Sequence, residues 1–170
     1  MKENVSNQRR KFLSQLIVSA GTLGALPLIL NSRQALGQSS NPLKIGIIGS
    51  GRIGGSVGLR WAEAGHEILF SSRNPDSLAD LVAQAGPKCH AGYPQEAAEF
   101  GDIVLVAVPY AATPQIGRDY GHLMQGKIVI DCGNPYVQRD GDMAADALER
   151  GTGVVSAEYL RGVRLVRAFN

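Results

Sequence analysis

The sequence predicts an α/β fold in which a doubly wound parallel sheet is covered by helices on both faces. Three observations predict it: short apolar runs typical of buried strands recur along the chain, segments of helical character alternate with them, and a glycine-rich turn at residues 49–54 follows the first run. A chain of 170 residues with 44% hydrophobic residues fits one domain with an ordinary core. The composition excludes a disordered chain, a coiled coil and a small disulfide-stapled scaffold.

Charge is divided unevenly along the chain. The 17 Lys and Arg residues against 15 Asp and Glu residues give a net charge of +2. Five of the basic residues and one acidic residue lie before residue 38, so residues 38–170 hold 12 basic and 14 acidic residues and carry a net charge of −2. This slightly acidic segment has no stripe of basic and aromatic residues, which argues against a nucleic-acid partner.

The first 37 residues have the features of an export signal. Arg9 and Arg10 precede a moderately apolar tract at residues 16–30, which is too short and too rich in Gly and Pro for a spanning helix. Ala35 and Gly37 provide small residues at the −3 and −1 positions of a cleavage site. The segment resembles a twin-arginine (Tat) signal peptide, which implies an exported, periplasmic or extracytoplasmic protein without a stable membrane span after cleavage. The alternative is a retained N-terminal membrane anchor.

A dinucleotide-binding fingerprint follows the first predicted strand, residues 43–48, and precedes a helix predicted over residues 56–64. Gly49 permits the tight turn, Gly51 lets the backbone approach a pyrophosphate, and Gly54 allows the helix to pack closely on the strand. The alternative is a glycine-rich turn that holds no ligand. The candidate cofactor contacts in this turn are Gly49, Ser50, Gly51, Arg52, Ile53 and Gly54.

The end of the second predicted strand, residues 67–71, favours NADP over NAD. In NAD-binding proteins an Asp or Glu about 20 residues after the first glycine binds the ribose 2′-hydroxyl. This chain has Ser71, Ser72 and Arg73 there, and hydroxyls with a guanidinium can bind a 2′-phosphate that a carboxylate would repel. Asn74 is expected to cap the next helix. The alternative for Arg73 is a solvated side chain without a ligand.

The remaining elements continue the alternation. Strands are predicted near residues 88–91, 102–108, 127–131 and 164–169, and helices near residues 94–99, 113–121 and 142–150. Thr113 is expected at the N-cap position of its helix. Alternating strands and helices imply a parallel sheet whose strands end at one edge, where ligands bind. That edge is expected to hold Gly49, Ser72, Pro109 and Asn134.

A family resemblance extends over residues 43–170. The chain resembles the deazaflavin (coenzyme F-420)-dependent NADP oxidoreductases and the related cytosolic domain of eukaryotic metalloreductases. The matching stretches are residues 45–54, 72–75, 107–110, 130–135 and 168–170. The resemblance implies a Rossmann domain that binds NADP(H) along the strand edge, with the 2′-phosphate at Ser72 and Arg73. It also implies four residues near the nicotinamide ribose and ring: Val108, Pro109, Asn134 and Pro135.

The resemblance implies an NADP(H)-dependent oxidoreductase that moves a hydride between the nicotinamide and a small-molecule flavin- or deazaflavin-like acceptor. Such a transfer needs alignment and exclusion of water more than acid–base help. Members of the family continue beyond the Ala-Phe-Asn strand, so we expect a domain shortened at the C-terminus, or an acceptor wall that comes from a homodimer or a partner subunit. The alternative function is a non-catalytic NADP-binding module or subunit that needs a partner to complete the substrate site.

Several further residues have expected roles. Tyr110 either contacts the substrate or packs in the core, and Asp131 is expected to serve a strand cap or a turn; the three histidines have no metal-like spacing, and no metal site is predicted. Cys89 belongs to the third strand and Cys132 follows the fifth, and in the usual order 3-2-1-4-5 these strands lie about 19 Å apart at ~4.8 Å per spacing. Because a disulfide needs Cα atoms within about 7 Å, we predict free, largely buried thiols.

Overall fold

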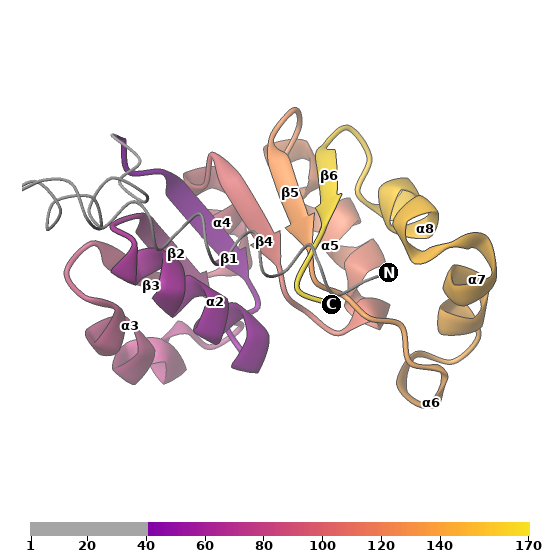
Figure 1. The fold of residues 1–170 in the computed structure, drawn as a ribbon, viewed down its shortest axis with the longest axis horizontal. Helices are drawn as coiled ribbons and strands as arrows, with labels where there is room; N and C mark the ends of the chain where they lie inside the picture. Colours follow the sequence, from indigo (N-terminus) through magenta and orange to yellow (C-terminus); the bar gives the residue numbers. More distant parts are fainter. Residues whose placement is uncertain (1–40) are drawn as a thin grey trace, which may run out of the picture. The chain divides into compact units, whose positions relative to one another are not determined.

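Six parallel strands form one sheet in the order β3-β2-β1-β4-β5-β6 (Figure 1). The computed structural model describes residues 41–170, so the predicted signal peptide at residues 1–37 lies outside the described residues. The strands are β1 (Lys44–Ile48), β2 (Glu67–Ser71), β3 (Cys89–Gly92), β4 (Ile103–Val106), β5 (Ile128–Asp131) and β6 (Arg164–Arg167). The α/β class and the expected order 3-2-1-4-5 of the first five strands are therefore confirmed, and β6 lies beside β5.

Helices connect the successive strands. They are α2 (Arg52–Glu63), α3 (Ala79–Ala85), α4 (Pro94–Phe100), α5 (Thr113–Tyr120), α6 (Val137–Asp140), α7 (Asp142–Arg150) and α8 (Thr152–Tyr159), with the 3-10 turns η2 (Pro75–Leu78), η3 (Tyr110–Ala112) and η4 (Gly121–Leu123). The predicted bounds of α7 are confirmed. Helices α6 and α8 were not predicted, because α6 is a single turn and the apolar residues of α8 do not gather on one helical face.

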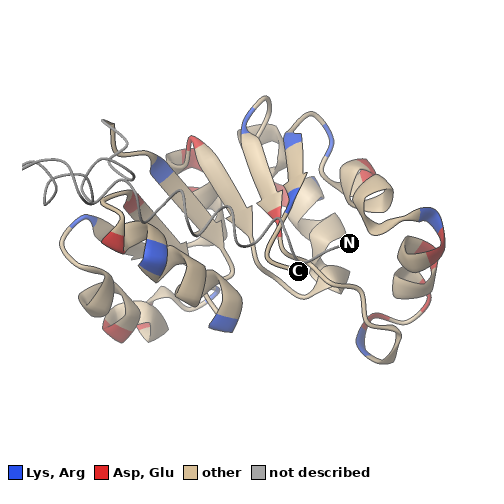
Figure 2. Ribbon diagram, viewed as in Figure 1, with Lys and Arg blue, Asp and Glu red and all other residues tan. Residues whose placement is uncertain are grey.

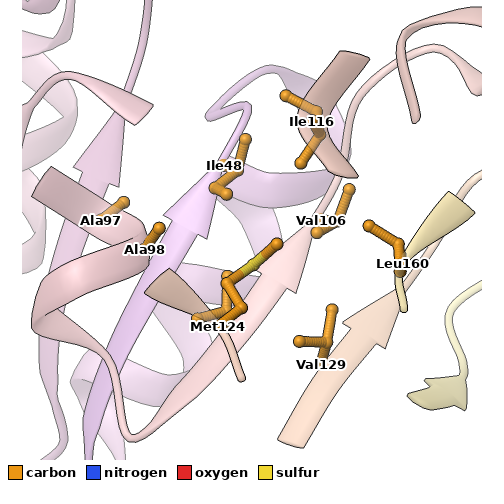
Figure 3. Close-up of a cluster of buried hydrophobic side chains, with 9 residues drawn as sticks. Ile48, Ala97, Ala98, Val106, Ile116, Met124, Val129 and Leu160 are labelled. Atoms are coloured by element: carbon orange, nitrogen blue, oxygen red, sulfur yellow. The ribbon is translucent and has the colours of Figure 1, made fainter. Parts of the chain in front are cut away.

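Apolar side chains pack on both faces of the sheet, which confirms that it is doubly wound. One cluster, drawn in Figure 3, contains Ile48, Ala97, Ala98, Val104, Val106, Ile116, Met124, Val129 and Leu160. A second cluster joins Ile47 and Phe70 of the sheet to partly buried residues of α2 and α3, among them Trp61. Ile47 and Ile48 enter different clusters because consecutive strand residues point to opposite faces.

The charged residues lie mainly on helices, on loops and at the ends of strands, and the middle of the sheet is free of them (Figure 2). The burial pattern agrees, since β1 and β4 are almost entirely buried. Strands of this kind read as continuous apolar runs in the sequence, which is why they were readily predicted. Across residues 41–170, no helix combines the length and the hydrophobicity needed to cross a membrane.

The two cysteines lie on well-separated strands. Cys89 begins β3 and Cys132 directly follows β5, with β2, β1 and β4 between these strands. Both thiols are free and buried. The predicted burial and the predicted separation are therefore confirmed.

Helix α2 begins earlier than predicted. Its first residue is Arg52 and not Ser56, because the glycine-rich turn uses only three residues. Gly51 is the N-cap, with an extended backbone, and its carbonyl already accepts the N–H of Gly55 at 2.7 Å. Arg52 and the next two residues of the motif therefore form the first turn of the helix.

Two predicted caps are also corrected. Asn74 occupies the N-cap position of η2, but its side chain makes no capping bond, and the Ser77 hydroxyl donates to the Asn74 carbonyl at 2.6 Å instead. Thr113 is the first residue of α5, and the N-cap is Ala112. In both places a 3-10 turn precedes the α-helix, so the chain enters the helix through this turn and not through the predicted side-chain cap.

Helices approach the sheet closely where glycine replaces a side chain. A Cβ added at Gly46 of β1 would lie 1.8 Å from the carbonyl oxygen of Ala97 in α4. On the opposite face, a Cβ added at Gly58 of α2 would lie 2.3 Å from the ring of Phe70. Both positions therefore require glycine for the observed packing.

Replacing Gly46 by alanine should destabilise the domain, because the clash is with the backbone of α4 and not with a side chain that could rotate away. We expect the free energy of unfolding to fall by about 3 kcal/mol, measured by urea denaturation. The control is Gly121→Ala, where an added Cβ meets nothing within 4 Å and φ is −55°. A Gly46→Ala variant as stable as this control would contradict the packing of α4 on β1.

Candidate functional site

A cleft of about 670 Å³ lies at the carboxyl edge of the sheet. The ends of β1, β2 and β4 form its floor, and η2 and α5 contribute its sides. We call it the first cleft. Seven of the predicted site residues line it: Gly49, Ser50, Gly51, Ser72, Arg73, Val108 and Pro109.

The glycine turn leaves room at the mouth of the first cleft. Gly49 has a φ of +95°, and an added Cβ would lie 2.7 Å from the carbonyl oxygen of Ala107, so this position requires glycine. At Gly51 an added Cβ would meet nothing within 4 Å, which leaves open space directly before the N-terminus of α2. Gly54 is buried, and an added Cβ would lie 2.1 Å from the Gly49 carbonyl oxygen. The packing role predicted for Gly54 is confirmed.

The end of β2 presents one free hydroxyl and one free guanidinium. Ser71 is fully buried and donates its hydroxyl proton to the carbonyl of Ile47 at 2.7 Å, so the expectation of two available hydroxyls is wrong. Ser72 Oγ accepts the N–H of Asn74 at 3.1 Å, which leaves its proton available. Arg73 is exposed and forms no ion pair or hydrogen bond with any other residue in 41–170.

The far wall of the first cleft was not predicted from the sequence. This wall consists of Ala112, the last residue of η3, and of Gln115, Ile116, Asp119 and Tyr120 of α5, with Ser77 of η2 on the near side. The sequence predicted the helix but held no signal for which of its polar residues would turn toward the glycine loop. That choice depends on the packing of α5 on the sheet, where Ile116 joins the buried cluster.

A second, smaller cleft of about 220 Å³ adjoins the first, and the two share Ala107, Val108 and Pro109 in their linings. Ala107 directly follows β4 and remains hydrogen-bonded to β1, since its N–H donates to the Ile48 carbonyl at 2.9 Å. After Ala107 the chain leaves the sheet between the two clefts. The other lining residues of the second cleft are Arg52, Ile53, Cys132, Asn134, Tyr136 and Arg139. Three predicted residues, Arg52, Ile53 and Asn134, therefore lie here, and Pro135 lines neither cleft.

The outer wall of the second cleft is held by Asp140. Its carboxylate accepts the backbone N–H groups of Tyr136 at 2.9 Å and Ala111 at 3.3 Å, and it pairs with Arg139 at 2.7 Å. The hydrogen bond from Arg139, followed by those from the backbone, lowers the pKa of Asp140 to about 2. Arg139 in turn donates to the carbonyl of Asn134 at 2.7 Å. The charge of Arg139 is thus already balanced within the wall.

Tyr110 and the three histidines lie outside both clefts. Tyr110 is fully buried and packs with Tyr159, Ala147 and Val155, so it serves the core and not the cleft. Burial raises the pKa of its hydroxyl. None of the histidines lines either cleft, and the described residues contain no group of three or more His, Cys, Asp or Glu side chains that could hold a metal.

The thiol of Cys132 should be unreactive although it lines the second cleft. Burial, and after it the carboxylate of Asp131, raises the pKa of Cys132 to about 11 from its ordinary 9.0. A rise of this size lowers the thiolate fraction at pH 8 about a hundredfold. In a Cys89→Ala variant we expect alkylation by iodoacetamide to be at least about a hundredfold slower in the folded protein than in urea. Equal rates in the two conditions would contradict the burial of Cys132.

Solved structures with the same fold include proteins of several functions. A hypothetical protein of Sinorhizobium meliloti is 28% identical, with a TM-score of 0.61 over 77% of this chain and 62% of that protein. A pyrroline-5-carboxylate reductase of Coxiella burnetii is 17% identical, with a TM-score of 0.57 over 75% and 43%. An imine reductase of Myxococcus stipitatus in complex with NADP⁺ is 17% identical, with a TM-score of 0.55 over 73% and 39%. The chain thus spans only part of the length of each protein.

The family profile described as "NADP oxidoreductase coenzyme F420-dependent" matches residues 44–135. This range is more than half of the 170 residues and holds β1 to β5, the glycine turn and all of the first cleft. It also holds the second cleft except for Tyr136 and Arg139. The resemblance that the motifs indicated is therefore confirmed. The chain belongs to the family of coenzyme F420-dependent NADP oxidoreductases.

Proposed function

We propose that this chain binds NADP(H) across the two clefts and transfers a hydride between the nicotinamide and a flavin- or deazaflavin-like acceptor. The observation that carries the proposal is the pair of Ser72 and Arg73 at the end of β2, which brings to the first cleft an available hydroxyl and a guanidinium that is unpaired within residues 41–170. No carboxylate stands between β2 and Asp76, so nothing there would repel a 2′-phosphate. Membership in the family supports the same cofactor.

The glycine turn suits a pyrophosphate. The open space at Gly51 lets phosphate oxygens approach the backbone, and the N-terminus of α2 directs its free N–H groups to that place. Ser50 has a buried hydroxyl without a hydrogen-bond partner among the described residues. A buried polar group of this kind gains a partner when a phosphate oxygen binds beside it.

The wall formed by α5 suits an adenine ring. Ile116 offers an apolar surface, and Gln115 and Asp119 offer acceptors for an exocyclic amino group. With the 2′-phosphate at Arg73 and the pyrophosphate at Gly51, the adenine would occupy the cleft between η2 and α5. The cofactor would then extend past Val108 and Pro109 into the second cleft.

The second cleft suits a hydride transfer, which needs alignment of the two reacting rings and little acid–base catalysis. Its lining contains no carboxylate and no histidine, and Ile53, Val108 and Pro109 make part of it apolar. A nicotinamide held there would supply or accept the hydride, with the accompanying proton exchanged with solvent. The chain contributes orientation, with the Asn134 amide as a hydrogen-bonding group for the carboxamide, and exclusion of water from one face.

Arg73→Ala should weaken NADPH binding about 10- to 100-fold, because a charge-assisted contact to the 2′-phosphate is lost. The dissociation constant of NADH should not change, and wild-type protein should prefer NADPH; both constants can be measured by calorimetry. The control is Arg60→Ala, which removes an exposed arginine of α2 that pairs with Glu63 outside both clefts. Equal affinity of wild-type protein for the two cofactors, or unchanged NADPH affinity in Arg73→Ala, would refute the 2′-phosphate site.

Hydride transfer is tested with the acceptor supplied. We expect the protein to catalyse the oxidation of NADPH by either a flavin or a deazaflavin. The absorbance of the reduced nicotinamide should then fall at a rate proportional to the protein concentration. The Arg73→Ala variant at the same NADPH concentration serves as the control and should be slower in proportion to its lost cofactor binding. Stoichiometric NADPH binding without turnover of either acceptor would support the non-catalytic NADP-binding module instead.

A further inference from the structure

A buried ion pair lies beneath the loop that forms one wall of the second cleft. Asp131 is the last residue of β5, Arg167 is the last residue of β6, and the two are register partners in the sheet. Asp131 Oδ2 and Arg167 Nη1 are 2.5 Å apart; the aspartate side chain is fully buried and that of the arginine is 18% exposed. Because removal of either charge would leave the other buried and unpaired, the two side chains hold each other in place.

Both members of the pair also bond the backbone of Gly133. Its N–H donates to Asp131 Oδ1 at 2.7 Å, and its carbonyl accepts from Arg167 Nη2 at 2.7 Å. Arg167 Nη1 further donates to the Ser156 hydroxyl of α8 at 3.3 Å. One ion pair therefore satisfies both polar backbone atoms of the residue directly before Asn134.

The space around Gly133 is closed. A Cβ added there would lie 2.9 Å from Asp131 Oδ1 and 3.2 Å from the ring of Tyr110. On the other side, Arg139 holds the carbonyl of Asn134 at 2.7 Å. The loop is thus fixed on both sides of the Asn134 side chain, which is half-buried, lines the second cleft and has no hydrogen-bond partner within residues 41–170.

We infer that Asp131 and Arg167 are positioning residues, which orient the Asn134 amide in the second cleft without touching the cofactor or the acceptor. The inference rests on the proposed function, since that function places the nicotinamide in this cleft. Two nitrogens of one planar guanidinium, Nη1 and Nη2, bond the Asp131 carboxylate and the Gly133 carbonyl in a fixed fork geometry, which the single nitrogen of an ammonium group does not reproduce. Within residues 41–170, no residue that lines the first cleft forms a hydrogen bond or ion pair with the side chains of Asp131 and Arg167, so we expect the adenine end of the cofactor to be independent of the pair.

The first test is Arg167→Lys, which keeps the charge and removes the fork. We expect the turnover number for hydride transfer to fall at least about tenfold while the dissociation constant of NADPH changes less than about threefold, because orientation is lost and not cofactor binding. In the ligand-free protein, the Gly133 amide should exchange with solvent faster than in wild type, measured by NMR. The control is Arg150→Gln, which removes an arginine that pairs with Asp146 and Glu158 outside both clefts and should leave all three quantities unchanged.

A second variant guards against a general loss of structure. Gly133→Ala keeps both charges and displaces the loop, so we expect the same fall in the turnover number while NADPH affinity is retained. Its far-ultraviolet circular dichroism spectrum should match that of wild type. The inference is overturned if both variants, Arg167→Lys and Gly133→Ala, transfer hydride at the wild-type rate. It is also overturned if NADPH affinity falls as much as the turnover number in both variants. In either case the proposed function stands. If wild-type protein does not bind NADPH, the proposed function fails, and the inference fails with it.

Discussion

The parallel pairing of β1 with both β2 and β4 is the constraint on which the rest of the structure depends. Since the chain reaches the two neighbours of β1 through separate crossovers, the strand order reverses at β1, and a crevice forms outside the carboxyl ends of these strands. The glycine turn, the Ser72–Arg73 pair and the loop after β4 all emerge at this crevice. Gly46 and Gly58 let helices pack closely on the two faces and so hold the strands in this order.

The two clefts meet at Ala107–Pro109 but are built differently. The first cleft depends on backbone: a turn with positive φ at Gly49, open space at Gly51 and the N-terminus of α2. The second depends on charged side chains beneath and beside its walls, the pairs of Asp131 with Arg167 and of Asp140 with Arg139. This division matches the proposed roles, because binding a phosphate needs exposed donors, whereas orienting a ring needs rigid walls.

Much of the fold and of the first cleft could be predicted, and the reasons are local. Buried parallel strands appear as apolar runs, and the glycine motif has one backbone geometry. The errors also have local causes: 3-10 turns replaced the expected caps at Asn74 and Thr113, and the helix after the glycine turn began at Arg52. The Ser71 hydroxyl is not available to a ligand because it donates to the carbonyl of Ile47. This bond joins neighbouring strands and could not be predicted from the sequence. The export signal at residues 1–37 stays a prediction.

The sequence by itself determined the class of the sheet and the residues of the glycine turn, because these follow from the hydrophobic pattern and from a short motif of fixed geometry. The order of the first five strands was expected as the usual order of this fold. Only the tertiary structure decided that Asp131 and Arg167, 36 positions apart, form a buried pair around Gly133. It also decided which face of α5 completes the first cleft. The physical reason is the same for both: the pairing of β5 with β6 and the packing of α5 on the sheet bring together side chains whose separation along the chain carries no periodic signal.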